Sequence, residues 1–145
     1  MASYSITMGN SRNLEHAQHN EKAYRYLCLH PEFSDWIITT AFYSAIHYIR
    51  HRMFPFEAQL KNGKIHKFDD FESLFNSFRK DGEGRHGFQL NWVRDHYGGI
   101  SRHYRRLHEL SNEARYFNYE FPADKIVSEV NGHLKAIRLF CQSDQ

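Results

Sequence analysis

The segment SDWIITTAFYSAIHYIRHRMF, residues 34–54, constrains the fold more than any other part of the sequence. Its apolar and aromatic side chains recur at helical spacing along two separate lines. The first line consists of Ile38, Phe42, Ala45 and Ile49, and the second of Trp36, Tyr43, His47 and Phe54. A helix that is apolar on more than one face is normally surrounded by other elements. We therefore expect residues 34–54 to form the central helix of a bundle and to end before Pro55.

Four further helices are predicted from the same spacing and from helix-breaking residues. The expected ranges are 13–30, 66–79, a long helix from 88 to about 116, and 122–141. Residues 55–65 are predicted to be a loop, and Gly98 and Gly99 are expected to kink or break the long helix. No alternating segment of useful length predicts a strand. The predicted fold class is all-α, a single antiparallel bundle of about five helices.

The length of 145 residues fits one domain with a sizeable core. We expect a disordered segment at 1–12 and the bundle at 13–142. Cys28 and Cys141 match no metal-binding spacing, and no stretch predicts a signal peptide or a membrane span. The sequence therefore predicts a cytoplasmic protein without a cofactor. Two aromatic-rich faces favour a homodimer, because symmetric association would cover them.

The positive charge of the chain is local. Residues 79–108 carry seven Arg and Lys against three Asp and Glu, whereas the chain as a whole has a formal net charge of +2. A local basic field attracts phosphate groups, but it also describes an ordinary solvated helix face. Both interpretations stay open at this point.

Polar side chains are predicted on three faces that look toward the bundle. They are His16 and Asn20 in the first helix, Tyr43 and His47 in the second, and the stripe of Arg105, His108, Asn112 and Arg115 in the fourth. If these faces meet, imidazoles would lie beside a phosphate-binding guanidinium. The alternative is a buried network in which the polar groups satisfy one another. A three-histidine metal site is a further alternative, although no Glu stands three residues before His16, His47 or His51, as it would in the Glu-x-x-His pairs of di-metal bundles.

Three runs of the sequence, LEHAQHNEKAYRYL, SDWIITTAFYSAIHYIRH and YRRLHELSNEARYF, resemble the HEPN superfamily of small helical-bundle domains. The resemblance spans about residues 14–141. The positions that carry it are His16, Asn20, Asp35, Trp36, Phe42, Tyr43, Ser44, Ala45, His47, Ser111, Ala114, Arg115 and Tyr116.

The resemblance implies a bundle of four or five helices that commonly dimerises. Many members are metal-independent ribonucleases of toxin-antitoxin and defence systems, with an arginine four to six residues from a histidine. This chain has Ser111, Asn112 and Arg115 where that motif is expected. Arg102 and His108 match the spacing, but such matches arise by chance in this composition, and the two residues would lie on different helix faces.

Two functional hypotheses follow. The first is a homodimer that binds RNA or a nucleotide, with weak ribonuclease activity as an extension and an antitoxin-like protein as a further partner. In it His47 and Arg115 are the candidate catalytic residues. The candidate ligand-binding residues are His16, Asn20, Tyr43, Arg105, Asn112 and Tyr116, and no metal ligand is assigned. The second hypothesis is a noncatalytic protein-interaction module in which these residues form a structural network.

Overall fold

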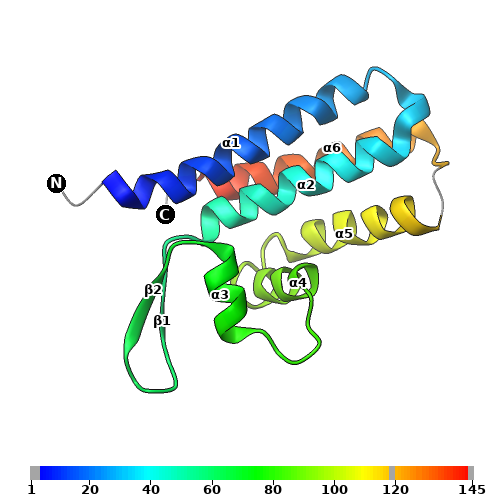
Figure 1. The fold of residues 1–145 in the computed structure, drawn as a ribbon. Helices are drawn as coiled ribbons and strands as arrows, with labels where there is room; N and C mark the ends of the chain where they lie inside the picture. Colours follow the sequence, from blue (N-terminus) through cyan, green and yellow to red (C-terminus); the bar gives the residue numbers. More distant parts are fainter. Residues whose placement is uncertain (1–3, 118–119, 144–145) are drawn as a thin grey trace.

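The computed structural model describes residues 4–117 and 120–143, and describes side chains from residue 12 onward. Its described part contains six α-helices, one short 3-10 helix and one β-hairpin (Figure 1). In chain order these are α1 (Tyr4–Leu27), η1 (Pro31–Phe33), α2 (Ser34–Met53), β1 (Phe56–Gln59), β2 (Ile65–Phe68), α3 (Phe71–Phe78), α4 (Arg85–His96), α5 (Ser101–Tyr116) and α6 (Ala123–Gln142).

Helix α2 is the central helix, as predicted. It packs against α1, α5 and α6, and in Figure 1 it lies between α1 and α5 with α6 behind. The first predicted apolar line is fully buried, since Ile38, Phe42, Ala45 and Ile49 are each 0% exposed. The second line differs at its start, because Trp36 is 57% exposed.

The prediction of a purely helical fold is wrong for residues 56–68. Strands β1 and β2 pair antiparallel with Phe56 opposite Phe68 and Gln59 opposite Ile65, and the hairpin projects from the bundle (Figure 1). Gly63 takes a positive φ of 83° at the end of a three-residue loop closed by Leu60 and Lys64, where a left-handed residue is usual and glycine is favoured. Four-residue strands are too short for an alternating pattern to stand out in the sequence. The predicted loop at 55–65 is therefore mostly a hairpin.

The start of the third predicted helix is corrected by the same region. The third helix begins at Phe71 instead of residue 66, because β2 occupies residues 65–68. Asp70 caps it by accepting a hydrogen bond from the backbone N–H of Ser73 at 2.8 Å. The break expected at Gly98 and Gly99 is present, and it divides the predicted long helix into α4 and α5. Six helices therefore replace the five expected.

The first helix begins earlier than the apolar spacing indicates, at Tyr4 instead of Asn13. The division into a disordered segment at 1–12 and a bundle at 13–142 stays a prediction, and residues 1–3 lie outside the described residues. Cys28 and Cys141 are both free cysteines. Within the described ranges, no helix combines the length and apolar content that crossing a bilayer requires.

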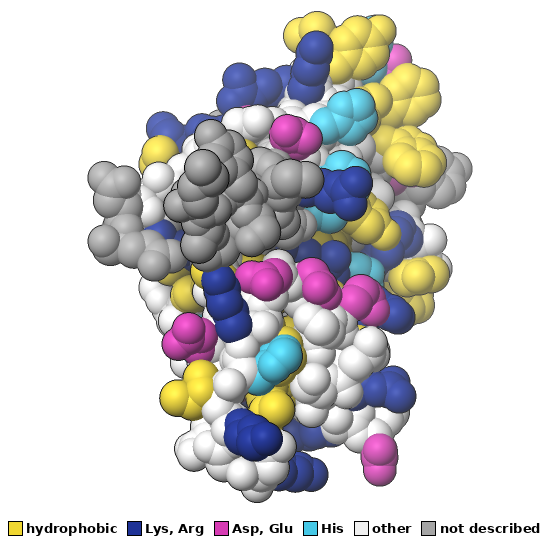
Figure 2. Space-filling model, turned by 60° about the vertical axis from the view of Figure 1, so that its left-hand side comes forward, with side chains coloured by type: hydrophobic (Ala, Val, Ile, Leu, Met, Phe, Trp, Pro, Cys, Tyr) yellow, Lys and Arg dark blue, Asp and Glu magenta, His cyan; other side chains and the backbone are white. Residues whose placement is uncertain are grey.

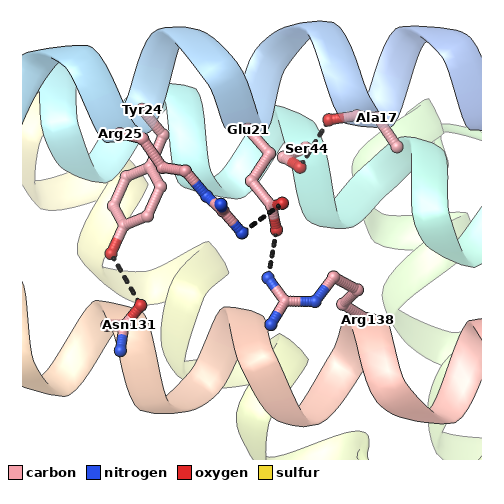
Figure 3. Close-up of polar contacts among 7 residues, drawn as sticks. All are labelled: Ala17, Glu21, Tyr24, Arg25, Ser44, Asn131 and Arg138. Atoms are coloured by element: carbon pink, nitrogen blue, oxygen red, sulfur yellow. Dashed lines mark hydrogen bonds and ion pairs between the residues drawn. The ribbon is translucent and has the colours of Figure 1, made fainter.

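Polar contacts fix α1 against α2 and α6 on one side of the bundle (Figure 3). The hydroxyl of Ser44 donates to the backbone carbonyl of Ala17 at 2.8 Å. The carboxylate of Glu21, a residue only 7% exposed, accepts hydrogen bonds from Arg25 at 3.1 Å and from Arg138 at 2.6 Å. These contacts hold the helices that support α2, whose opposite side packs on α5.

Candidate functional site

A groove lies between the first turns of α2 and the last turns of α5. Its volume is about 360 Å³. The residues that line it are Asp35, Trp36, Thr39, Tyr43, Ala114 and Arg115. Asp35, Trp36 and Tyr43 each lie three or four residues from Thr39, so the four α2 residues share one side of that helix.

Arg115 is the only permanently charged cation among these lining residues, and neutral groups hold it in place. Its Nε donates to the backbone carbonyl of Ser111 at 3.3 Å. One terminal nitrogen donates to the Tyr43 hydroxyl at 3.4 Å, and the other donates to Oδ1 of Asn112 at 3.2 Å. The first of these bonds joins α5 to α2 across the groove. The guanidinium is therefore oriented before any ligand binds.

Arg115 forms no ion pair with any residue that the structure describes. Arg106 differs, because its Nε lies 2.6 Å from a carboxylate oxygen of Glu129. Asp35 lines the same groove as Arg115 but is not within ion-pairing distance of it. The positive charge of Arg115 is thus available to an anion, while the carboxylate of Asp35 can accept a hydrogen bond from a sugar hydroxyl or a base amino group.

Two histidines from other parts of the chain lie beside this groove. The rings of His86 from α4 and His108 from α5 have centroids 6.4 Å apart, and His86 is also 6.4 Å from the ring of Tyr43. Burial lowers the pKa of both imidazoles, and the charge of Arg115 lowers it further. Both rings are therefore neutral near neutral pH, and a neutral imidazole can accept a proton.

His47, the predicted catalytic histidine, belongs to a separate contact. Its Nδ1 lies 3.3 Å from Oδ1 of Asn13, and its ring is 4.5 Å from the ring of His16. Burial lowers the pKa of His47 to about 4, with smaller contributions from His16 and Arg50. No hydrogen bond, ion pair or ring contact between described residues joins His47 to Arg115.

The remaining predicted ligand-binding residues divide between the groove and the surface. Tyr43 and Asn112 bind Arg115 directly. Tyr116 is 70% exposed, and the Arg115 guanidinium carbon lies 5.4 Å from its ring centroid. His16 is exposed beside His47, and Asn20 is half-buried on α1. Arg105 is exposed, with its Nε 3.9 Å from Glu109.

Sequence reasoning missed the place of His86 and the exposed ring of Trp36. His108 already stood in the predicted stripe with Asn112 and Arg115, at steps that place all three on one side of α5. His86 lies in a glycine-rich stretch, and only the packing of α4 brings it to the groove. On the face shown in Figure 2, histidine side chains lie next to Arg or Lys side chains and next to hydrophobic ones.

Metal ligands are sparse. Among the residues with described side chains, no three His, Cys, Asp or Glu side chains gather as a metal site would require. The chemistry that the groove offers is therefore that of a fixed guanidinium, two neutral imidazoles and two aromatic rings. Such a set suits a phosphate group attached to an unsaturated ring system.

Comparison with known proteins adds no further assignment. The chain matches no protein-family model, and neither the curated proteins nor the solved structures yield a match.

Proposed function

We propose that the groove between α2 and α5 binds a nucleotide or a single-stranded RNA segment through a phosphate group. The observation that carries the proposal is the state of Arg115, which three neutral acceptors orient and no described carboxylate neutralises. A planar guanidinium in this state can donate two parallel hydrogen bonds to phosphate oxygens. The exposed rings of Trp36 and Tyr116 offer surfaces on which bases stack.

The proposal extends to weak, metal-independent cleavage of RNA, the activity of many members of the superfamily that the sequence resembles. Proton transfer is assigned to His86 and His108, because these imidazoles lie near Arg115 and His47 does not contact it. One imidazole accepts the proton of the ribose 2′-hydroxyl as the 2′-oxygen attacks phosphorus. The other imidazole, neutral in the resting site, first takes a proton from water and then gives it to the departing 5′-oxygen, which leaves a 2′,3′-cyclic phosphate. Arg115 stabilises the charge on the phosphate oxygens.

The binding step is tested by fluorescence anisotropy of a labelled single-stranded RNA at several salt concentrations. Arg115→Ala is expected to weaken binding about 10- to 100-fold, since a hydrogen bond to a charged group contributes about 1.5–3 kcal/mol. Arg115→Lys should restore binding only in part, because lysine lacks the planar fork. Arg94→Ala is the matched control, since Arg94 is exposed and paired with Asp95. Equal affinities for the wild type and Arg115→Ala would overturn the proposal.

The cleavage step is tested by analysing the RNA products for 2′,3′-cyclic phosphate ends in the presence of a metal chelator. His86→Ala and His108→Ala should abolish cleavage and leave binding within a few-fold of the wild type. His47→Ala should retain cleavage. If His47→Ala alone is inactive, the acid–base role belongs to the residue predicted from the sequence, and the assignment to His86 and His108 is wrong.

A second candidate function is a noncatalytic interaction module, in which Arg115, Tyr43 and Asn112 form a structural link between α2 and α5. The observation that favours it is the mutual hydrogen bonding of these three residues. This reading expects Arg115→Ala to cost about 1–3 kcal/mol of unfolding free energy by leaving partners unsatisfied. It also expects no salt-dependent RNA binding by the wild type. Urea denaturation of the same variants distinguishes the two functions.

We also propose that the protein forms a homodimer. By the same resemblance, we propose that it acts in a toxin-antitoxin or defence system with an antitoxin-like protein partner. Exposed apolar side chains near the groove support association with a second surface. Trp36 is 57% exposed and Phe117 is 85% exposed. Burying such rings against a second chain would remove a large apolar area from water.

A further inference from the structure

Away from the groove, a pair of histidines joins α5 to α6. Nδ1 of His103 lies 2.9 Å from Nδ1 of His133, and the ring centroids are 5.2 Å apart. Both residues are half-buried, so each ring has one side open to water. Two ring nitrogens with lone pairs facing each other repel, so a proton or another cation has to lie between nitrogens at this distance.

Neighbouring charged groups determine which tautomer His133 adopts. Its Nε2 lies 3.5 Å from Oε1 of Glu129, and the same oxygen accepts a hydrogen bond from Nε of Arg106 at 2.6 Å. The carboxylate favours a proton on Nε2 of His133, which leaves the lone pair of Nδ1 directed at His103. A carboxylate that fixes the outer nitrogen of an imidazole is the usual support of a metal-binding histidine.

We propose that His103 and His133 bind a divalent transition-metal ion of the Zn²⁺ class between their two Nδ1 atoms. The proton that these atoms share then moves through water to Nε2 of His103, so both imidazoles stay neutral and each directs an Nδ1 lone pair at the ion. Zn–N bonds of about 2.0–2.1 Å in tetrahedral geometry put two ligand nitrogens about 3.3 Å apart. The two rings therefore need to separate by about 0.4 Å, which small side-chain rotations can provide. Water completes the coordination, because the described side chains supply no third ligand.

The ligand type determines which ions fit. Two imidazole nitrogens suit Zn²⁺, Ni²⁺ and Cu²⁺, whereas Mg²⁺ and Ca²⁺ prefer oxygen ligands. Arg102 and Arg106 lie near the pair and oppose any purely electrostatic attraction of a cation, while Glu129 favours it. Binding therefore depends on the nitrogen–metal bonds. This inference is independent of the proposed function, although a bound ion would also tie α6 to the helix that carries His108, Asn112 and Arg115.

The test uses tag-free, metal-stripped protein, because a polyhistidine tag would bind the same ions. Thermal unfolding is followed during titration with ZnCl2 and, separately, with MgCl2, and equilibrium dialysis counts the ions bound. Zn²⁺ is expected to raise Tm progressively and to bind in a ratio of one ion per chain, whereas Mg²⁺ should leave Tm unchanged. His103→Gln and His133→Gln should each abolish the shift. Glu129→Gln should weaken it, since Glu129 acts through His133.

Two further variants separate this site from other histidines. His19→Gln, an exposed histidine of α1, is the matched control and should keep the full shift. His47→Gln tests the other close histidine pair, His16 and His47. If the Zn²⁺ shift survives in His103→Gln and His133→Gln, or disappears in His47→Gln alone, the proposal is wrong. Because Tm of each variant is also measured without metal, a general loss of stability is distinguished from a lost site.

Discussion

The arginines of α5 differ in what surrounds each guanidinium. Arg106 donates to the carboxylate of Glu129 at 2.6 Å, and Arg105 lies 3.9 Å from Glu109. Arg115 is bound only by neutral oxygen atoms among the described residues. A charge that is already paired attracts an additional anion weakly, and a charge held by neutral groups keeps its field. At the scale of single residues, this difference favours Arg115 over Arg105 and Arg106 as the phosphate-binding candidate.

The lowered pKa of His47 predicts how the free energy of unfolding depends on pH. Its folded-state pKa is about 4, below the ordinary histidine value of about 6.5. The unfolded chain therefore binds a proton between these two values while the folded chain does not, so stability falls as pH falls from about 6.5 toward 4. Lowering the pH from 7 to 5 should cost about 1–2 kcal/mol from this residue, measured by urea denaturation.

The control for this prediction is His47→Gln, which cannot be protonated. The variant should lose less stability than the wild type between pH 7 and pH 5. It should still lose some, because the pKa values of His86 and His108 are also lowered. Identical pH profiles for His47→Gln and the wild type would show that the ring of His47 is more hydrated than its burial indicates.

Residue spacing predicted part of the candidate site. Arg115 and Asn112 are three residues apart on one helix, and the structure shows them hydrogen-bonded. Tyr43 stood on the correct face of α2. The position of His86 beside the groove depends on how α4 packs after the turn at Gly82, and no local sequence pattern predicts that packing. Helical spacing thus identifies neighbours within a helix, whereas contacts between distant elements require the tertiary structure.

At the scale of elements, the sequence predicted the central helix and the break at Gly98 and Gly99 but missed the hairpin. The helical period is repeated over five turns in α2, so single exceptions such as Trp36 do not hide it. Strands of four residues repeat an alternating pattern only twice, and Phe56 and Phe68 are also compatible with a helix. Short strands are therefore determined by their pairing and their turn.

The ion pair between Glu21 of α1 and Arg138 of α6 leads to a prediction about the stability of the fold. Arg138→Ala should lower the free energy of unfolding by about 2–4 kcal/mol, because it removes a partner from the buried carboxylate of Glu21. Arg25→Ala should cost less than about 1 kcal/mol, since the Arg25 side chain is 65% exposed whereas that of Arg138 is 24% exposed. Urea denaturation of both variants at pH 7 provides the comparison.

The double variant Glu21→Gln with Arg138→Ala completes this test. It should recover part of the stability lost in Arg138→Ala, because no buried charge then lacks its partner. If Arg25→Ala and Arg138→Ala are equally destabilised, burial does not decide the strength of the two contacts, and the argument from exposure is wrong.

At the scale of the whole molecule, exposed apolar side chains gather at the corner where α1 ends and α2 begins. This corner patch consists of Tyr26, Leu29, Phe33 and Trp36, which are 65%, 75%, 46% and 57% exposed. Single exposed apolar residues are common on protein surfaces, but several within eleven consecutive positions favour contact with another chain. The corner patch also borders the groove through Trp36.

The corner patch supports the prediction of a homodimer. Light scattering should give roughly twice the chain mass of 17.4 kDa at micromolar concentrations. Leu29→Lys should shift the protein to monomers by placing a charge in the interface. Leu139→Lys is the matched control, because Leu139 is 58% exposed on α6 and lies outside the patch. If the wild type is monomeric at every concentration, the prediction of a homodimer is wrong. If Leu139→Lys dissociates the dimer and Leu29→Lys does not, the interface lies on α6 instead of at the corner patch.

The buried contact between Glu21 and Arg138 also restricts how the protein can evolve. A lineage that replaces the acid at position 21 leaves a half-buried guanidinium without its partner, and one that replaces the arginine first leaves a buried carboxylate. Each single replacement lowers the stability of the folded protein, so the two positions should change together or not at all. Aligned descendants of this chain should therefore show covariation between positions 21 and 138, while position 25 varies freely.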